Sequence, residues 1–574
     1  MLRRHVFYAV MLSVQGLLGP AGVLALQVQG TVFVDANGNG QRDADEQGLQ
    51  GVMVSDGVTV VDTGADGAYT IEAAGAPALV WVSLPRDYQV VGRFWHWTDG
   101  SKPADFALAA SSQPDEFNLV QITDAHVGRG DVVQQFCQRL NSFPVPLAFV
   151  VNTGDLVGGV DVVQPEEAPR QYVAYMDAVK PLKLPLFNLP GNHEHVGFNH
   201  PTADRAHPFF GKGLYPLMLG PMHYSWDWGP VHFVGLDGTR ISYREALGDE
   251  QLTWLAEDLK RQPAEKPIVL FCHQSLLQVK DRPAMIEVLK GRRVLGGFCG
   301  HLHATWEKNQ DGFTVYHTGA LSGSWWSGPN PDGSPQGFRL IRLAKEGLET
   351  AFFGREGPWS ISVLKPSTSD VQKGVVPVEA IVLDFGEDVV LTATLAGEPV
   401  PLRRGARAAL WSTWTGKLDT TVVPDQLAEL VFKASGQGQE STMSTRFIID
   451  NGKRTAATVR EDAVLRLQVR GVEQANIVRF NGEQLGTMSP VPNDTWIEFT
   501  VPAALLQNLN VLTIEAVAPE GGTNKDDFSI GPVRLEVAGK TYYDPRQASF
   551  TRYSVGDNDP ASYADKLELY FCLP

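Results

Sequence analysis

The sequence has little cysteine, more acidic than basic residues, and no long apolar run after its start. Its four cysteines, Cys137, Cys272, Cys299 and Cys572, are too few to build a disulfide scaffold in a chain of 574 residues. We expect Cys272 and Cys299 to be small buried residues rather than a disulfide or thiolate ligands. Lys and Arg number 48 against 65 Asp and Glu, a net charge of −17, which disfavours nucleic acid as a partner. The same balance favours a soluble, secreted or periplasmic protein.

The start of the chain is the one stretch that looks like a targeting segment. Two arginines precede an apolar run over residues 6–18, and Val23-Leu24-Ala25 offers a small-residue cleavage site. This pattern predicts an export signal over residues 1–25 and a periplasmic or secreted protein. The alternative is an uncleaved anchor, which Gly16, Gly19 and Pro20 disfavour because they weaken a membrane helix. We expect no membrane span once the signal is removed, and whether it is removed stays open.

The remaining patterns predict several domains. Residues 26–110 hold short alternating strands separated by glycine turns, as in an Ig-like β-sandwich. Residues 116–345 read as an α/β domain, with helices expected over 132–140, 172–179 and 248–261. Residues 355–440 predict a small β-sandwich, and residues 444–574, with an Asn481-Gly482 hairpin turn, predict a jelly-roll-like β domain. The expected fold class is multidomain α/β plus β.

A loop rich in Asp and Asn lies inside the first β segment. It fits the calcium-loop pattern D-x-N-x-N-G-x5-E, with oxygen ligands at alternate positions and Gly40 at the sharp turn. Strands rather than helices flank it, so it is not an EF-hand, and it resembles the calcium loops of bacterial B-type immunoglobulin-like repeats. The alternative is an Asx-rich turn that binds no ion. We expect a calcium ion as a structural clip, with candidate ligands Asp35, Asn37, Asn39, Gln41, Asp43 and Glu46.

Five short apolar runs in the α/β segment are each followed by residues that bind metals. The runs cover residues 119–122, 147–151, 186–189, 268–272 and 294–299. Residues just beyond the carboxyl ends of such strands meet in one crevice of an α/β fold. The sequence therefore predicts a single metal site built from Asp124, His126, Asp155, Asn192, His273, His301 and His303.

This donor set suits two divalent metals and the hydrolysis of phosphate esters. Two metals ~3.5–4 Å apart neutralise the phosphoryl charge and activate a bridging water. A carboxylate shared between them is the natural bridge, and Asp155 is the candidate. Histidine with carboxylate favours Mn, Fe, Zn or Co over Ca or Mg. We assign Asp124, His126 and His303 to the first metal, and Asn192, His273 and His301 to the second.

The ordered motifs D-x-H, G-D, G-N-H-E, a lone His and G-H-x-H resemble the calcineurin-like metallophosphoesterase superfamily. They stand here between Asp124 and His303. The resemblance implies a four-layer αββα sandwich that hydrolyses phosphate esters by attack of a metal-bridging hydroxide. It also implies that His193 is the general acid for the leaving oxygen. Glu194 and His195, the next two residues, are candidates for orienting His193.

The domain order resembles a bacterial exported subgroup, with an Ig-like domain before the catalytic unit and a β domain after it. The loop that contains Trp325 and Trp326 follows the pattern of that subgroup. These two tryptophans are candidates for a wall of the substrate pocket. The alternative is that they hold the next domain to the catalytic one.

The site predicts a phosphate-ester substrate, and the choice between phosphodiester and phosphomonoester stays open. The flanking β domains suit a phospholipid or glycan-linked substrate, and equally a small nucleotide. A different class of function is a glycan- or surface-binding protein in which the β modules dominate and the metal unit is secondary. The polar-aromatic loops at 525–528 and 542–544 are of the kind that sugar-binding modules carry. The sequence does not set the oligomeric state.

Overall fold

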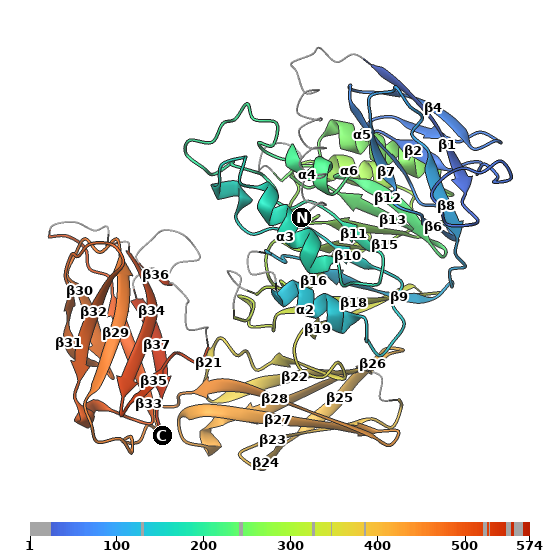
Figure 1. Cartoon of the computed structure of the whole chain (residues 1–574). Helices are drawn as coiled ribbons and strands as arrows, with labels where there is room; N and C mark the ends of the chain where they lie inside the picture. The colour runs from blue at the N-terminus through green and yellow to red at the C-terminus, as the bar shows by residue number, and fades with distance from the viewer. Residues whose placement is uncertain are drawn as a thin grey trace. The chain divides into compact units, whose positions relative to one another are not determined.

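The computed structural model describes residues 25–127, 131–239, 245–323, 328–345, 347–383, 386–520, 525–526, 528–546, 553–555 and 566–574. It divides into two compact units, each described by itself below (Figure 1). Unit 1 runs to Ser322 and includes Gly337–Arg355, and unit 2 consists of Gly323–Gln336 and Glu356–Pro574. The predicted export signal, except Ala25, and the predicted pocket residues Trp325 and Trp326 lie outside the described residues. Within the described ranges, no helix is long and apolar enough to cross a membrane.

Unit 1 begins with two four-stranded sheets. Residues alternate between buried and exposed along β4, so that Tyr69 and Ile71 enter the core, as expected for a sheet with one wet face. The order β4-β1-β8-β6 joins strands Ala68–Ala73, Leu26–Val34, Phe106–Ala110 and Tyr88–Val90. The order β3-β2-β5-β7 joins strands Val60–Asp62, Met53–Ser55, Ala78–Val82 and Trp95–Thr98. The predicted short strands are present, while the Ig-like layout stays a prediction.

Two larger sheets follow in unit 1, and both mix parallel and antiparallel pairings, with the parallel strands β11-β10-β9 in one and β13-β14-β15-β17 in the other. Strands β9, β13 and β14 are buried along their whole length, as expected for strands covered on both faces. The five-stranded order β11-β10-β9-β18-β19 joins Leu186–Asn188, Val150–Asn152, Phe117–Ile122, Gly337–Ala344 and Gly347–Gly354. The six-stranded order β12-β13-β14-β15-β17-β16 joins Tyr224–Trp228, Val231–Leu236, Ile268–Cys272, Val294–Cys299, Phe313–His317 and Trp306–Gln310.

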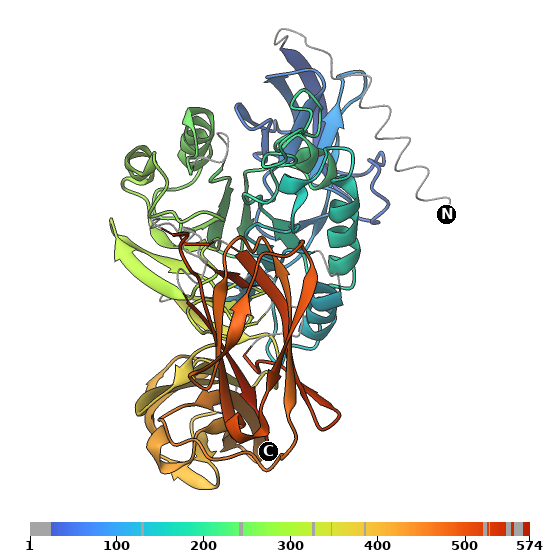
Figure 2. The ribbon, with the colours of Figure 1, turned by 90° about the vertical axis from the view of Figure 1, so that its left-hand side faces the viewer.

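An aromatic core packs these two sheets face to face. Trp226 stacks between Phe187 of β11 and Phe233 of β13, with ring centroids 4.2 and 5.4 Å away. Helices α2 (Asp131–Leu140) and α3 (Pro169–Val179) lie on the opposite side of the sheets from α5 (Asp249–Lys260) and α6 (Arg282–Leu289), as the teal and green helices of Figure 2 show. A short helix α4 covers Leu214–Met218. The three predicted helices and the mixed α/β domain are confirmed, and α6 was not predicted.

The small sheets and the α/β layers of unit 1 share contacts. Ser83 Oγ lies 2.9 Å from Ser225 Oγ of β12, and the Arg261 guanidinium binds Asp62 of β3 at 3.0 Å. Behind this contact, His232 is fully buried between Asp227 and Asp258, at 2.8 and 2.7 Å. Burial lowers the pKa of His232, but Asp258 and Asp227 outweigh it and raise that pKa to about 9. A buried cation therefore lies under the junction at neutral pH.

The described residues of unit 2 form four further sheets and no α-helix. The first two join β20-β22-β26-β25 (Ile361–Lys365, Val375–Leu383, Trp411–Asp419, Leu402–Arg407) and β21-β28-β27-β23-β24 (Val371–Gln372, Gln439–Ile449, Gln426–Gly436, Val390–Leu395, Glu398–Val400). The others join β32-β29-β34-β35, with β36 on β34 (Thr495–Val501, Ala463–Arg470, Phe528–Val537, Lys540–Tyr542, Tyr553–Val555), and β31-β30-β33-β37 (Glu483–Met488, Asn476–Phe480, Leu509–Glu515, Lys566–Cys572).

The domain boundary expected between residues 440 and 444 falls inside strand β28, which pairs with β27 along its whole length. The first half of β28 is polar and partly exposed, so it lacks the apolar alternation that would have revealed a strand. The additional β-sheets of the fold-class prediction are confirmed. The jelly-roll layout stays a prediction.

Candidate metal centre

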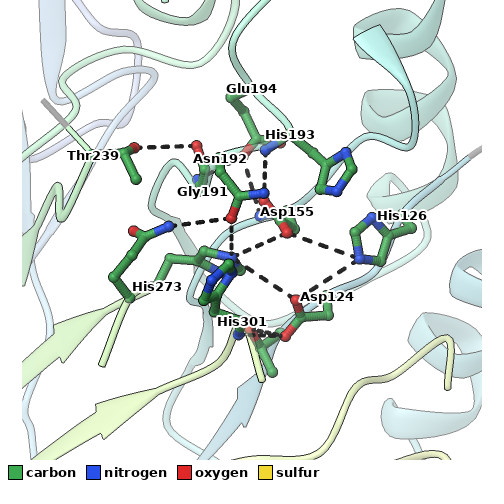
Figure 3. A network of polar contacts seen from close by, with 12 residues as sticks. Asp124, His126, Asp155, Gly191, Asn192, His193, Glu194, Thr239, His273 and His301 are labelled. Atoms are coloured by element: carbon green, nitrogen blue, oxygen red, sulfur yellow. Dashed lines mark hydrogen bonds and ion pairs between the residues drawn. The ribbon is translucent and has the colours of Figure 1, made fainter. Parts of the chain in front are cut away.

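The structure brings all seven predicted ligand residues to the carboxyl edge of the two large sheets of unit 1. Figure 3 shows Asp124, His126, Asp155, Asn192, His273 and His301. Asp124 and His126 follow β9, Asp155 follows β10, and Asn192 follows β11. His273 follows β14, and His301 and His303 follow β15. Parallel strands end at the same edge, and the face-to-face packing of the sheets places both sets of loops together.

The first group of ligands consists of Asp124, His126 and His303. His303 Nε2 lies 3.1 Å from Asp124 Oδ1 and 3.2 Å from His126 Nε2. Asp124 Oδ2 accepts hydrogen bonds from the His301 N–H at 3.0 Å and from Thr123 Oγ at 2.8 Å. Oδ1 is therefore the oxygen that faces the two imidazoles. Burial lowers the pKa of His126 to about 3, so this ring is neutral and has a lone pair to share.

The second group consists of His273, His301, Asn192 and Asp155. His273 Nε2 lies 3.0 Å from Asp155 Oδ2 and 3.2 Å from Asn192 Oδ1. His273 Nδ1 lies 3.1 Å from the Thr153 carbonyl oxygen, and only the ring nitrogen of that pair is able to donate. Asp155 Oδ2 also lies 3.9 Å from His126 Nε2, so this one oxygen stands between the two groups.

Both groups fit a cation. With Nδ1 engaged by a carbonyl, a neutral His273 would turn its Nε2 lone pair toward two oxygen acceptors, an arrangement that only a positive charge satisfies. Burial lowers the pKa of His273, but Asp155 and Asp124 raise it to about 9. The carboxylates thus favour positive charge at this point. The nitrogen and carboxylate donors suit Mn, Fe, Zn or Co.

Five of the seven ligand residues have left-handed backbone angles. The φ values are 51° for Asp124, 43° for His126, 51° for Asp155, 68° for His301 and 49° for His303. The left-handed region costs about 1–2 kcal/mol for a residue with a Cβ, and such strain gathers at functional sites. Two backbone hydrogen bonds join the turns, from Asp124 N to Gly154 O at 3.0 Å and from His126 N to Asp155 O at 2.9 Å.

The glycine of the G-N-H-E motif leaves room for the Asp155 carboxylate. A Cβ on Gly191 would lie 2.2 Å from Asp155 Oδ1. No side chain fits at that distance, so any substitution would displace Asp155. The motif glycine is therefore a requirement of close packing around the ligand.

Glu194 does not orient His193, contrary to the sequence-based expectation. Its fully buried carboxylate accepts N–H bonds from Asp155 at 3.1 Å, Leu156 at 2.8 Å, Val157 at 3.2 Å and Gly191 at 2.5 Å. Burial and Asp155 raise the pKa of Glu194 to about 7. Glu194 thus holds the Asp155 loop against the Gly191 turn. His195 Nδ1 donates to the Asn192 carbonyl at 3.1 Å, and a role of His195 in orienting His193 stays a prediction.

Asp161 is the group that faces His193, and the sequence-based reasoning missed it. Asp161 lies in a single 3-10 turn over Val160–Val162, and its Oδ1 is 3.3 Å from His193 Nδ1. Asn199 donates to the other oxygen at 2.8 Å. The His193 ring packs edge-on against His126, with centroids 4.9 Å apart. Burial lowers the pKa of His193, but Asp161 and Asp155 raise it to about 9, so the ring is cationic at neutral pH.

A second shell fixes the Asn192 side chain. Buried Gln274 donates from Nε2 to Asn192 Oδ1 at 3.2 Å, so this oxygen, rather than the amide nitrogen, points to His273. The Lys212 ammonium binds Asp237 and Thr239 at the end of β13 and anchors the loop that follows Asn192. The sequence has no motif that reveals Gln274 or Lys212.

The predicted calcium loop is present as a closed turn. Asp35 accepts N–H bonds from Gly38 and Gly40, both at 2.7 Å. Glu46 accepts N–H bonds from Ala36 at 2.9 Å and Asp43 at 3.0 Å. The acidic groups of the loop therefore already bind its backbone, and the calcium ion stays a prediction.

The two loops considered for glycan binding use their acidic groups internally. Asp526 accepts an N–H bond from Gln474 at 2.9 Å, and Asp544 accepts one from Tyr570 at 3.0 Å. Both aspartates are buried. Cys272 and Cys299 are buried free thiols, as expected.

Comparison with known proteins gives two family matches and three relatives. Residues 36–111 match the N-terminal domain of calcineurin-like phosphoesterases, and residues 117–305 match the calcineurin-like phosphoesterase family. The 3',5'-cyclic adenosine monophosphate phosphodiesterase CpdA of Haemophilus influenzae is 24% identical over 35% of this chain and 75% of its own length. The protein of the same name from Vibrio vulnificus is 23% identical over 36% and 76%. A probable glycerophosphodiester phosphodiesterase, GpdQ, of Arcobacter nitrofigilis is 22% identical over 32% and 71%.

Proposed function

Because this chain belongs to the calcineurin-like phosphoesterase superfamily, we propose that it is an exported, metal-dependent phosphodiesterase whose centre lies at the seven ligand residues. One observation carries this proposal: the two groups of ligand atoms share Asp155 and face inward with acceptor atoms. The diester preference is supported by the phosphodiesterase names of all three relatives. Export is supported by the basic and apolar start of the chain.

Asp124, His126 and His303 would hold one divalent ion, Asn192, His273 and His301 would hold the other, and Asp155 would be shared between them. When bound, the two ions neutralise the phosphoryl charge and activate water as the nucleophile. Gln274 keeps the Asn192 carbonyl oxygen on the metal side, which leaves the amide N–H₂ for a phosphoryl oxygen. Glu194 holds the two loops that carry Asp155 and Asn192 at a fixed separation.

His193 donates a proton to the departing alcohol oxygen. Its ring borders the first ligand group through His126, and its Nδ1 is directed to Asp161. We assign the opposite nitrogen, Nε2, to the departing oxygen. Asp161, steadied by Asn199, keeps the ring at this angle and stabilises its cationic form. Asp161 is a positioning residue, because it acts through His193.

The test compares esters with good and poor leaving groups after loading with Mn, Zn or Fe. We expect the wild type to hydrolyse a nitrophenyl phosphodiester faster than the nitrophenyl monoester. Asp155→Ala should lose both metal and hydrolysis. His193→Ala should keep its metal and lose about 10²–10⁴-fold in rate on an alkyl leaving group, with a smaller loss on nitrophenolate.

Full activity of His193→Ala on the alkyl ester would refute the proton-donor role. A strong preference for the monoester would refute the diester assignment and leave the metal centre in place. Retention of metal and turnover by Asp155→Ala would refute the shared-carboxylate centre.

The β-sheets outside the metal centre suit a phospholipid or glycan-linked phosphodiester and equally a nucleotide diester, so the proposed natural substrate is a phosphodiester of one of these classes. The proposed domains remain residues 26–110 and 116–345, followed by two β domains. We place the boundary between these two β domains after Ile449, the last residue of β28. A function as a glycan-binding protein is less supported, because Asp526 and Asp544 are occupied within their own domain. We retain calcium at Asp35–Glu46 as a proposed structural clip.

A further inference from the structure

Trp306 stands beside the metal ligands at the edge of the six-stranded sheet. It is the first residue of β16 and follows His303 by three positions. It pairs in register with His317, the last residue of β17, and His317 pairs with Cys299, the last residue of β15. The loop with His301 and His303 starts directly after Cys299. The row from Trp306 to Cys299 therefore runs along the metal-bearing edge of the sheet.

The indole is held rigidly and keeps surface open. Its centroid lies 3.9 Å from the His317 ring and the planes differ by 10°, so one face of the indole is stacked. His317 is fully buried and bound to Ser275 at 2.9 Å, which makes it a fixed backing. Trp306 itself is 37% exposed on a strand whose next three residues are exposed and polar. A large aromatic side chain gains free energy from burial, so an open indole held flat is suited to covering a ligand.

Trp306 and His193 lie on opposite flanks of the centre. His193 follows β11, and Leu189, the residue after that strand, packs against Gly235 of β13. At the other flank, Arg339 of β18 donates to Thr318 and to the His317 carbonyl, which ties the five-stranded sheet to the end of β17. Four of the five strands that precede the candidate ligands, β9, β10, β14 and β15, stand between these two contacts in the sheet order, and the fifth, β11, lies at the His193 flank.

We infer that Trp306 is a specificity residue that stacks on a planar aromatic ring carried by the ester arm that stays on phosphorus. The inference rests on the proposed phosphodiesterase function, in which His193 takes the arm that leaves. A phosphoryl group at the metal centre directs its leaving oxygen toward His193, so the retained arm is free to extend to the other flank. A nucleobase is the biological ring of this kind, and stacking on an aromatic side chain contributes about 1–3 kcal/mol per base.

The experiment uses two diesters with the same leaving group, bis(4-nitrophenyl) phosphate and methyl 4-nitrophenyl phosphate, on the full-length protein. Only the first keeps an aromatic ring on phosphorus after cleavage. Trp306→Ala should raise KM for the bis-aryl ester about 5- to 100-fold and leave KM for the methyl ester within about twofold. Trp306→Phe should restore most of the difference. Metal content, measured by elemental analysis, should equal that of the wild type in both variants.

Trp496→Ala, at a second exposed tryptophan that lies in unit 2, is the matched control and should change neither substrate. Equal losses on both diesters, or a fall in metal content, would show a purely structural role for Trp306 and overturn the inference. Unchanged KM on both would also overturn it. Hydrolysis of neither diester by the wild type would instead refute the proposed function, and the inference with it.

Discussion

The substitution Glu194→Gln tests whether one buried carboxylate sets the geometry of the centre. Glu194 accepts four backbone N–H groups, with Leu156 and Val157 on Oε1 and Asp155 and Gly191 on Oε2. Glutamine keeps one acceptor oxygen and replaces the other with an N–H₂ donor. Two N–H groups would then face a donor. Because those groups belong to the loop of the bridging ligand and to the Gly191 turn, we expect the two loops to separate locally.

The magnitude follows from two opposing effects. Hydrogen bonds to a charged group contribute roughly 1.5–3 kcal/mol each, so the loss of two costs about 3–6 kcal/mol. Removing the buried charge of Glu194 offsets part of this cost, because the charge itself is unfavourable in the protein interior. The pKa of Glu194 lies at about 7 against an ordinary 4.5, and that shift equals about 3 kcal/mol of unfavourable charge burial. The net expectation is a local destabilisation of up to about 3 kcal/mol. Glu194→Ala leaves all four N–H groups without an acceptor and should be worse.

Amide hydrogen exchange is the suitable assay, because a chain with several domains does not unfold in one step. Peptides that contain residues 154–157 and 191–194 should exchange about 5- to 100-fold faster in Glu194→Gln than in the wild type. A peptide from β34 in unit 2 should be unchanged and serves as the internal control. Metal content should fall in the same order, wild type, Gln, Ala. Wild-type exchange and metal content in Glu194→Ala would refute the reasoning.

Three further predictions concern other parts of the chain. The pKa of buried His232 is raised to about 9 in the folded protein, above the unfolded value of 6.5, so its contribution of roughly 3 kcal/mol to stability is complete below pH 6.5 and is lost as pH rises through 9. The melting temperature of the wild type should therefore fall across that pH window. The same pH dependence in a His232→Gln variant would contradict this. Gln274→Met should lower the affinity for the second metal about 10- to 100-fold and leave the affinity for the first unchanged. Calorimetric titration with Mn²⁺ measures both affinities, and no change in either would exclude the positioning role of Gln274. Calcium should raise the melting temperature of the wild type and not that of Asp35→Ala, and an unchanged wild-type transition would remove the proposed clip.

The candidate ligands could be grouped from the sequence because each follows a short, mainly apolar strand. The strands before Asp124, Asp155 and His273 are buried along their whole length, and parallel strands leave their last residues at one edge. Order and spacing then sufficed to place all seven residues together. The described side chains form one cluster of Asp124, His126 and His303 and another of Asp155, His273 and His301, and the assignment of each cluster to a metal stays a prediction.

The groups that support the ligands were not readable, because they are defined by contacts and not by spacing. Asp161 reaches His193 only because a left-handed Gly159 precedes a single 3-10 turn. Gln274 looks like an ordinary polar residue until its amide is seen next to Asn192. Glu194 was predicted to orient His193 because the two residues are adjacent in sequence. The backbone N–H groups that Glu194 binds are not apparent from the sequence. Strand β28 was missed because its first half carries no apolar alternation.

The left-handed backbone turns of the candidate ligand loops restrict which residue types these positions accept. Asp, Asn and His adopt positive φ several-fold more often than other side chains, whereas Val, Ile and Thr adopt it rarely. A library that randomises Asp124, His126, Asp155, His301 and His303, selected first for folding alone, should therefore return Asp, Asn, His and Gly before any metal is added. The backbone conformation would then restrict the residue types at these five positions before any metal selects among them. The presence of Asp and His there, and not of Glu or Cys, would follow from the left-handed turns as much as from metal binding.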